Sequence, residues 1–264
     1  MTQSTGAWRG RLDRSFFPSD RSTEGRSAII SQVCGRYRLS GRKQIVEEYF
    51  DCGYCGEEDW SPRYNIAPTQ LVPVIRQNPK EPVRQLSLMR WGLIPSWAKN
   101  ASGAAMMINA RSETANTKPA FAEPLKFRRC LIPADGFYEW QRTGKCKQPY
   151  CFEVNDGELF AFAGLWDRWK DPGGGWIRTC SILTTTANAA TSAVHNRMPV
   201  ILEPDSYDRW LNPGTADASE LLKPCDARLM RCYPVSTRIN HVANDDEECA
   251  RRVEPAEIQH QLFT

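Results

Sequence analysis

The chain has 264 residues, of which 41% are hydrophobic and nine are tryptophan, enough to fill the core of one large domain or two small ones. Its formal net charge is only +3, so any contact with nucleic acid must come from a local patch rather than from an overall positive field. No apolar run approaches the roughly 20 residues that a membrane helix needs. Ten cysteines without a secretory signal indicate a reducing compartment, so we expect a cytoplasmic protein.

The first 33 residues differ in character from the rest. Residues 1–33 are rich in Ser, Arg, Gly and Thr, a composition typical of disorder. Because Val33 can be encoded by GTG, an alternative bacterial start, we interpret residues 1–33 as an extension from a misassigned start. A pro-segment removed before Cys34 and a flexible tail that stays attached are the alternatives. In the first two cases Cys34 is the N-terminal residue, and its free α-amine and thiol can close a thiazolidine ring with an aldehyde. We expect nearby arginine charge to lower the pKa of both groups.

Beyond Cys34 the expected elements are short and mostly strands. We expect strands at 34–39, 71–76, 85–93, 106–110, 129–132, 150–154, 159–166 and 176–185. We expect helices at 42–50, 112–126, 187–195 and 205–211, the second interrupted by two prolines. Residues 52–68 are expected to form a loop, and 155–157 a hairpin turn.

The order of these elements predicts the fold class. Because the strands do not alternate regularly with helices, the pattern favours an α+β fold rather than a βαβ fold. We expect one compact domain over 34–243, followed by a C-terminal tail at 244–264.

Glu139 is the first candidate for proton transfer. It lies between Tyr138 and Trp140, and a carboxylate among aromatic rings is desolvated, which raises its pKa toward neutrality. The alternative is a strand carboxylate that faces water or pairs with an arginine, and the residues alone favour that alternative.

His195 and Asn109 are further candidates, because a histidine titrates near neutral pH and an asparagine can orient an amine or hydroxyl. A lone histidine is more often structural, and an asparagine at a strand end more often caps a turn. The pair Cys52 and Cys55 has no second pair at similar spacing, so loop thiols are favoured over a zinc site.

Arginines lie within two residues of three of these candidates, and tryptophans are frequent. Arg36, Arg111 and Arg197 carry guanidinium groups that suit phosphate binding, and Trp97 could stack on a base of single-stranded nucleic acid. The alternatives are arginines paired with carboxylates and tryptophans packed in the core.

Eight ordered strings together closely resemble the SRAP family, the SOS-response-associated peptidase-like proteins. They are Cys34-Gly-Arg-Tyr, Arg63-Tyr-Asn-Ile-Ala-Pro, Arg90-Trp-Gly-Leu-Ile-Pro with Trp97, Ile108-Asn-Ala-Arg-Ser-Glu-Thr, Arg129-Cys-Leu-Ile-Pro, Gly136-Phe-Tyr-Glu-Trp, Phe162-Ala-Gly-Leu-Trp and His195-Asn-Arg-Met-Pro. The resemblance covers nearly all of residues 34–243. It implies a single domain around a barrel-like, mainly antiparallel sheet with peripheral helices and a positively charged groove for single-stranded DNA.

The resemblance also implies an activity and a role for each candidate. Family members crosslink to abasic sites in single-stranded DNA through a terminal cysteine, a role that falls here on Cys34. Amine positioning falls on Asn109, proton transfer on Glu139, and sugar opening and reversal of the link on His195. The resemblance assigns contacts with DNA to four further side chains, Arg36, Trp97, Arg111 and Arg197.

We therefore expect a monomeric protein of the DNA-damage (SOS) response that binds single-stranded DNA with abasic sites and has weak lyase activity. No cofactor, metal or membrane is expected to take part. The chain departs from the family in one respect, since 33 residues precede the cysteine where the family has only Met.

Two other functions remain open at this point. Cys34 could act as the nucleophile of an autopeptidase that removes residues 1–33. A passive binder of single-stranded DNA is the third hypothesis, and it leaves the clustered Cys, Asn, Glu and His without a role.

Overall fold

The computed structural model describes residues 34–55, 59–78, 81, 83–144, 146–215 and 217–254. The expected disordered extension at 1–33 and the final part of the expected tail, 255–264, lie outside these ranges. None of the helices in the described ranges is long and apolar enough to cross a membrane.

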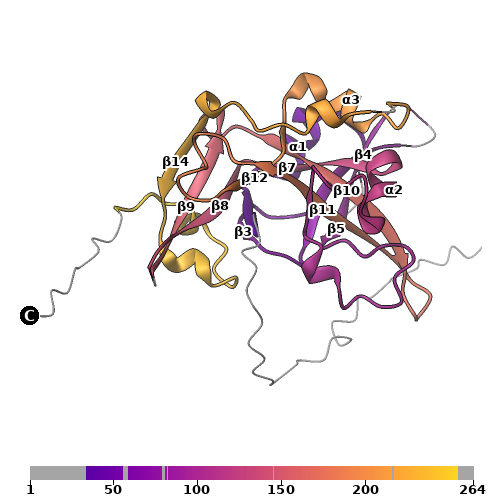
Figure 1. The fold of residues 1–264 in the computed structure, drawn as a ribbon, viewed down its shortest axis with the longest axis horizontal. Helices are drawn as coiled ribbons and strands as arrows, with labels where there is room; N and C mark the ends of the chain where they lie inside the picture. The colour runs from indigo at the N-terminus through magenta and orange to yellow at the C-terminus, as the bar shows by residue number, and fades with distance from the viewer. Residues whose placement is uncertain are drawn as a thin grey trace, which may run out of the picture. The chain divides into compact units, whose positions relative to one another are not determined.

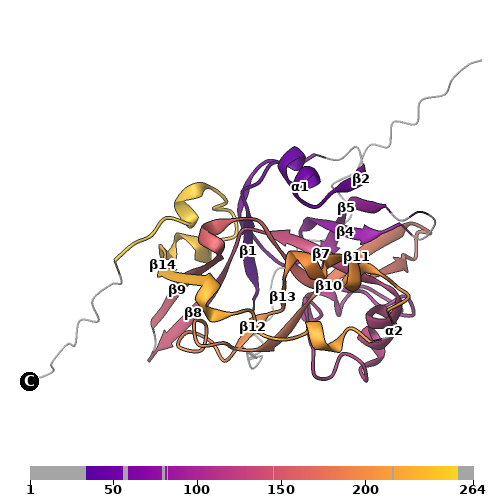
Figure 2. The same ribbon diagram turned by 90° about the horizontal axis from the view of Figure 1, so that it is seen from above.

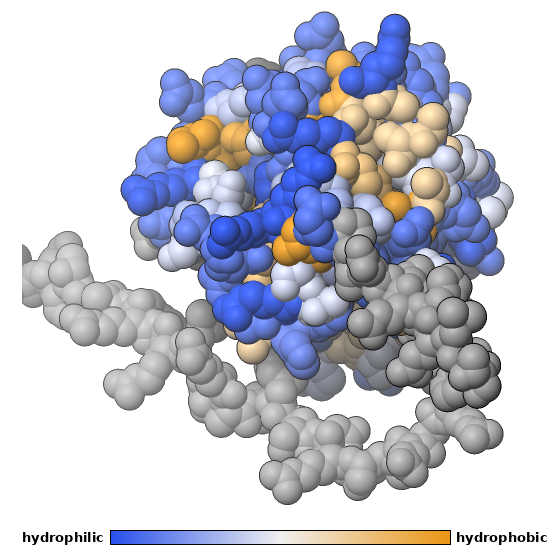
Figure 3. Space-filling view, turned by 90° about the vertical axis from the view of Figure 1, so that its left-hand side faces the viewer, coloured by the Kyte–Doolittle hydropathy of each residue, from blue (hydrophilic) through white to orange (hydrophobic). Residues whose placement is uncertain are grey.

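Two β-sheets form the described part of the chain (Figures 1 and 2). Neighbouring strands of the smaller sheet are all antiparallel, and its spatial order is β14 (Met230–Pro234), β9 (Cys146–Val154), β8 (Gly136–Thr143), β1 (Arg36–Leu39) and β3 (Arg63–Ile66). The side of the molecule on which β14, β9 and β8 lie is mostly hydrophilic, with hydrophobic residues in a few patches (Figure 3).

The larger sheet closes on itself. Its order is β12 (Arg197–Pro199), β11 (Trp176–Thr186), β10 (Phe160–Lys170), β7 (Arg129–Ala134), β4 (Leu71–Gln77), β5 (Arg84–Trp91) and β2 (Cys52–Cys55), while β13 (Ile201–Leu202) pairs with β10 and β6 (Asn109–Arg111) with β11. An additional parallel pairing joins β5 to β11, with Cys180 opposite Trp91. Strands β11, β10, β7, β4 and β5 therefore form a closed, mainly antiparallel barrel, as the resemblance implied.

Helices are short and peripheral. The α-helices of the described ranges are α1 (Lys43–Tyr49), α2 (Pro119–Phe127) and α3 (Tyr207–Leu211). Single 3-10 turns are η1 (Ala104–Met106), η2 (Asn155–Gly157), η3 (Pro204–Ser206), η4 (Ser219–Leu221), η5 (Ala227–Leu229), η6 (Thr237–Asn240) and η7 (Glu247–Cys249). Helix α2 begins at Pro119 because proline suits the first turn of a helix, where its missing N–H is not needed. Two sheets accompanied by a few short helices confirm the α+β prediction.

Aromatic side chains join the two sheets in a common core. Tyr37 of β1 packs edge-on against Trp91 of β5 and Phe162 of β10, with ring centroids 5.3 and 5.6 Å apart. All three side chains are fully buried. Strand β1, which carries the start of the described chain, is thus held against the barrel.

Several local predictions were wrong, one because of long-range strand pairing and another because of local side-chain hydrogen bonds. Residues 52–68 contain two strands, because β5 and β1 provide pairing partners. Residues 187–195 form turns rather than a helix. The Asn188 side chain accepts from the backbone N–H groups of Ala190 and Thr191 at 3.1 and 3.0 Å, which replaces helical hydrogen bonding.

The turn at 155–157 has positive φ angles of 46°, 59° and 91°, but it does not close a hairpin, since β9 and β10 belong to different sheets.

Candidate active site

Cys34 lies beside Glu139 because β1 runs antiparallel to β8. Arg36 is paired with Tyr138, so the same register, continued by one residue, puts Gly35 opposite Glu139 and Cys34 next to that pair. The backbone N–H of Cys34 donates to Glu139 Oε1 at 2.5 Å. Cys34 is fully buried and has a left-handed φ of 46°, an uncommon conformation outside glycine. The nitrogen that would be the α-amine of an N-terminal cysteine therefore contacts a carboxyl group directly.

The environment of the Cys34 thiol corrects one expectation. We expected nearby arginine charge to lower the pKa of the thiol. Instead, burial raises it well above its ordinary value, and the Glu139 carboxylate raises it further. Arg36 is not among the groups that shift the pKa of the thiol. Its guanidinium donates to Asn65 Oδ1 at 2.8 Å and to the Ile239 carbonyl at 2.7 Å.

Glu139 is nearly inaccessible to solvent, with 3% of its surface exposed. Desolvation raises the pKa of its carboxyl group to about 8, although backbone hydrogen bonds from Cys34 and Trp140 act in the opposite direction. The residues alone favoured a carboxylate facing water or paired with an arginine, and burial in the fold decides for the desolvated one. A carboxyl group with such a pKa can both give and take a proton near neutral pH.

His195 lies in the turn that precedes β12. Its Nδ1 accepts the backbone N–H of Arg197 at 3.1 Å, so the neutral ring carries its proton on Nε2. Burial lowers the pKa of the imidazole, and the charges of Arg142 and Arg197 lower it further. Gln141 of β8 donates to the Ala193 carbonyl at 3.1 Å, which ties the His195 turn to the strand that carries Glu139.

Asn109 and Arg111 lie on β6, beside the end of β11. They are paired with Ile182 and Thr184 in the parallel register. Asn109 is half-buried, whereas Arg111 is exposed. Strand β12 pairs with residues 184–186 of β11, so the segments that carry Asn109, Arg111 and Arg197 meet around residues 182–186.

The four candidate DNA-binding side chains differ in their availability. Trp97 is 65% exposed, and Arg111 is exposed as well. Arg197 is held by the protein, since its guanidinium makes a two-pronged pair with the Glu113 carboxylate at 3.0 Å for both contacts and donates to the Thr184 carbonyl at 2.7 Å. Arg36 is held by Asn65 and Ile239, as described above. Glu113 lies in one of the family strings, but its partner could not be read from the sequence.

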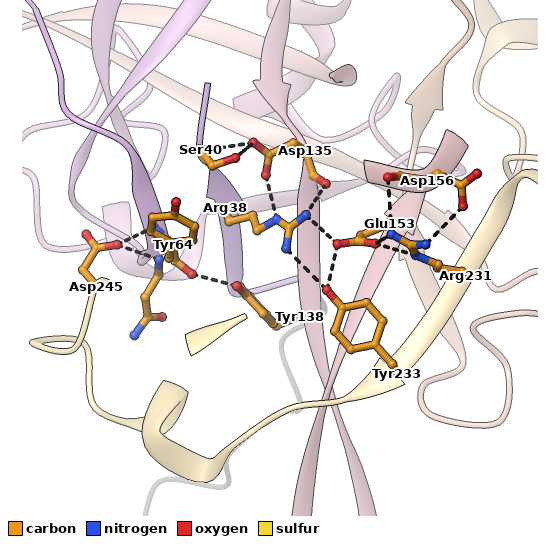
Figure 4. Close-up of polar contacts among 11 residues, drawn as sticks. Arg38, Ser40, Tyr64, Asp135, Tyr138, Glu153, Asp156, Arg231, Tyr233 and Asp245 are labelled. Carbon is orange, nitrogen blue, oxygen red and sulfur yellow. Dashed lines mark hydrogen bonds and ion pairs between the residues drawn. The ribbon is translucent and has the colours of Figure 1, made fainter. Parts of the chain in front are cut away.

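The segment at 236–249 completes the surroundings of β1 and was missed. Asn65 of β3 donates to the carbonyls of Ile239, His241 and Asn244 at 3.2, 3.0 and 2.6 Å. Asp245 Oδ1 accepts the backbone N–H groups of Tyr64 and Asn65 at 2.6 and 2.7 Å (Figure 4). The boundary expected at residue 243 therefore falls inside a packed segment, and Asn65 in the family string was the one local signal of it.

A buried ionic network anchors β1 on its other side (Figure 4). Arg38 donates to Asp135 Oδ1 at 2.7 Å and to Glu153 Oε1 at 2.5 Å, and both carboxylate side chains are only 4% exposed. Arg231 and Tyr233 of β14 bind the same Glu153 carboxylate, each at 2.7 Å. These contacts fix the strand four residues after Cys34, which limits the movement of the cysteine relative to Glu139.

The described ranges contain no group of three or more His, Cys, Asp or Glu side chains that could hold a metal ion.

Comparison with known proteins places residues 33–242 in one family. The family model described as SOS response associated peptidase (SRAP) matches residues 33–242. The chain is 41% identical over 221 residues to the abasic site processing protein YoqW of Bacillus subtilis (strain 168), covering 82% of this chain and 98% of that protein. It is 34% identical over 269 residues to the abasic site processing protein HMCES of Gallus gallus, covering 88% of this chain and 78% of that protein.

A solved structure is similar to this chain in fold. A crystal structure of a protein from Bacteroides thetaiotaomicron is similar with a TM-score of 0.75 and 29% identity, covering 83% of this chain and all of that one.

Proposed function

The chain belongs to the SRAP family, and on that premise we propose that it processes abasic sites in DNA by linking itself covalently to them through Cys34. The observation that carries the proposal is the 2.5 Å contact between the Cys34 nitrogen and the Glu139 carboxyl group. The names of the bacterial and vertebrate relatives support the same substrate.

The reacting partner of DNA is the open-chain aldehyde of an abasic deoxyribose. The Cys34 amine attacks C1′ to give a carbinolamine, which loses water to form an imine. Glu139 takes a proton from the attacking nitrogen and returns one to the departing hydroxyl. The Cys34 sulfur then adds to the imine carbon, the thiol proton ends on the nitrogen, and the five-membered thiazolidine closes with the loss of one water molecule overall.

The pairing of amine and carboxyl group suits this sequence of steps. An α-amine has a pKa of about 7.7–8.0, close to the value of about 8 for Glu139. Two groups so matched share a proton near neutral pH, and one of the two arrangements is a neutral amine beside a carboxylic acid. That arrangement combines the nucleophile with the acid that expels water. The buried thiol stays protonated until the imine forms next to it.

The remaining site residues have supporting roles. Asn109 orients the amine or sugar hydroxyl, and neutral His195 assists ring opening and reversal through its Nε2 proton. Exposed Trp97 and Arg111 contact bases and phosphates of single-stranded DNA, and Arg36 and Arg197 shape the groove beside them. An imine that fails to close permits β-elimination, so weak lyase activity accompanies the crosslink. The protein acts as a cytoplasmic monomer within the SOS response.

The chemistry requires a free amine on Cys34. In a chain that retains residues 1–33 this nitrogen is an amide, which is not a nucleophile. Translation from Val33 followed by trimming, or removal of a pro-segment, would supply the amine. The family match that begins at residue 33 supports either route.

The word peptidase in the family description favours one second candidate. Attack by the Cys34 sulfur on the Val33 carbonyl carbon, followed by hydrolysis of the thioester, would release residues 1–33 and leave the same terminal cysteine. The raised pKa of the thiol disfavours the thiolate that such an attack needs.

Denaturing electrophoresis tests both functions. Single-stranded DNA with one abasic site is mixed with a chain that begins Met-Cys34 and with one that begins at residue 1, and undamaged DNA is the control. A shifted band only with the first chain supports the crosslink and the need for a free amine. A band with both chains, together with clipping of residues 1–33, supports the peptidase. Salt-sensitive binding without any denaturation-resistant band would leave a passive DNA binder.

A further inference from the structure

The β10–β11 hairpin carries a cluster of positive charge that the proposed chemistry does not use. We define the hairpin cluster as four cationic and two aromatic side chains: Arg76, Arg168, Lys170, Arg178, Trp166 and Trp176. The end of this hairpin lies on the opposite side of the barrel from β8, β9 and β14 (Figures 1 and 2). Arg168, Lys170, Trp176 and Arg178 are all exposed.

The pairing of the two strands gathers these side chains on one face. Arg168 is directly opposite Arg178, and Lys170 is opposite Trp176. Residues two apart on a strand share a face, so Trp166 belongs to the same row. Like charges directly opposite each other destabilise a sheet. Among the residues that the structure describes, no carboxylate forms an ion pair with these three cations.

Arg76 of β4 adds a nearly buried cation to the exposed ones of the cluster. Its guanidinium lies over the Trp166 ring, 4.9 Å from the centroid, and only 8% of the residue is exposed. Its Nε is buried without a hydrogen-bond partner in the described part of the chain. Burial and the charge of Arg178 both lower the pKa of Arg76. A nearly buried cation beside a second cation, with no carboxylate to offset either, is a site that an anion would stabilise.

Two arginines that lie over tryptophan rings indicate which kind of anion the cluster binds. Arg168 lies over the exposed Trp176 ring at 5.1 Å, repeating the arrangement of Arg76 on Trp166. Guanidinium groups bind phosphate oxygens in a two-pronged manner, and an exposed indole offers a platform for a base. We propose that the hairpin cluster binds the phosphodiester backbone of single-stranded DNA as a second contact, separate from the crosslinking site.

The position of the cluster on β11 connects it with that site. Arg178 precedes Thr184, the residue beside Arg111 and Arg197, by six residues of continuous strand. At about 3.3 Å per residue the two regions are roughly 20 Å apart. A strand of DNA covers that span with about six nucleotides at roughly 3.4 Å each. This inference rests on the proposed function for its choice of DNA, and it places the flank of the damaged strand on the hairpin.

The test compares two DNA lengths and two pairs of substitutions. The short oligonucleotide has 3 nucleotides on either side of an abasic site or an undamaged base, and the long one has 15. The variant combines Arg168→Gln and Arg178→Gln. The control combines Arg228→Gln and Arg251→Gln, which also remove two charges, from exposed arginines paired with Asp226 and Glu248. Fluorescence anisotropy gives affinities over a range of salt concentrations, and denaturing gels give crosslinking at saturating DNA.

The expected result is a loss that depends on length. Each phosphate contact contributes about 0.7 to the slope of log affinity against log salt on single strands, so two lost contacts weaken long DNA about 25-fold at 0.1 M salt. Binding of short DNA, crosslinking at saturation and the control variant stay at wild-type values. Equal loss on both lengths, equal loss in the control, or no loss overturns the inference. If wild type forms no crosslink but undamaged long DNA still shows the loss, only the proposed function fails.

Discussion

Replacing Glu139 with glutamine separates its chemical role from its structural cost. Glutamine keeps an oxygen that can accept the Cys34 N–H, but it cannot transfer a proton. General acid–base catalysis contributes about 10²- to 10⁴-fold, so we expect Glu139→Gln to slow crosslinking at least about 100-fold while DNA affinity is unchanged. Two groups titrate near pH 8 in the wild type, the α-amine and the Glu139 carboxyl group, and only the α-amine should shape the pH profile of the variant.

The same substitution should stabilise the fold at high pH. The pKa of Glu139 is raised from 4.5 to about 8 in the folded protein. Its protonated form therefore supports the fold below pH 4.5, and that contribution is lost as the pH rises through 8. At about 1.4 kcal/mol per pKa unit, the cost of the buried carboxylate at pH 9 is up to roughly 5 kcal/mol, which the glutamine avoids.

Two assays check this prediction on two forms of the chain. Single-turnover crosslinking from pH 5 to 9 uses the chain that begins Met-Cys34, and thermal unfolding at pH 5 and 9 uses the chain from residue 1, where the Cys34 nitrogen is an amide. Glu248→Gln, on an exposed carboxylate paired with Arg251, serves as the control and should change neither. Crosslinking kinetics that are unchanged in Glu139→Gln at every pH would refute the proton-transfer role.

Three further outcomes are expected. Cys34→Ser should lose the heat-stable adduct but keep an imine that borohydride traps, and a stable adduct without borohydride would contradict ring closure through sulfur. Arg38→Ala removes the ion-pair partner of the buried Asp135 carboxylate and leaves Glu153 paired with Arg231 alone, so it should lower the free energy of unfolding by about 3–5 kcal/mol in denaturant titrations at pH 7. Gly92→Ala should lower the melting temperature more than Gly144→Ala, since φ is positive at both positions (127° and 60°) but only at Gly92 would the new Cβ lie 2.7 Å from the Ala104 carbonyl oxygen; equal losses would contradict the steric reason.

Burial around Cys34 bears on how the reaction is protected. The thiol and the carboxyl group of Glu139 are both removed from solvent, and β1 is held by Arg38 on one side and by Asn65 through the 236–249 segment on the other. A rigid, desolvated pair is pre-organised for reaction, because little rearrangement is needed when the aldehyde arrives. The cost is a raised thiol pKa, which delays sulfur attack to the imine stage.

Local chemistry made much of this protein predictable from its sequence. The order of short strands and few helices was sufficient for the α+β class. Apolar spacing located both α1 and α3; it agrees with burial in α3, where Tyr207, Trp210 and Leu211 are buried, whereas in α1 only Val46 is buried. The aromatic neighbours of Glu139 marked it as a candidate for a raised pKa, but the residues alone favoured a carboxylate facing water or paired with an arginine, and burial decided between the two. The family strings likewise lie within short stretches of sequence, so Cys34 and the other candidates could be selected before their positions in space were known.

Only the tertiary structure decided what those residues touch. Arg36 binds a carbonyl 203 residues away, and Asp245 binds backbone groups 180 residues away, so neither partner leaves a local pattern. The Cys34 thiol was expected to be activated by arginine, but full burial raises its pKa, because desolvation is set by every element packed around it. The hairpin cluster exists because antiparallel pairing places Arg168 opposite Arg178 and the barrel brings Arg76 beside them. Burial, pairing and charge proximity are properties of contacts between distant segments, and those contacts form only when the chain folds.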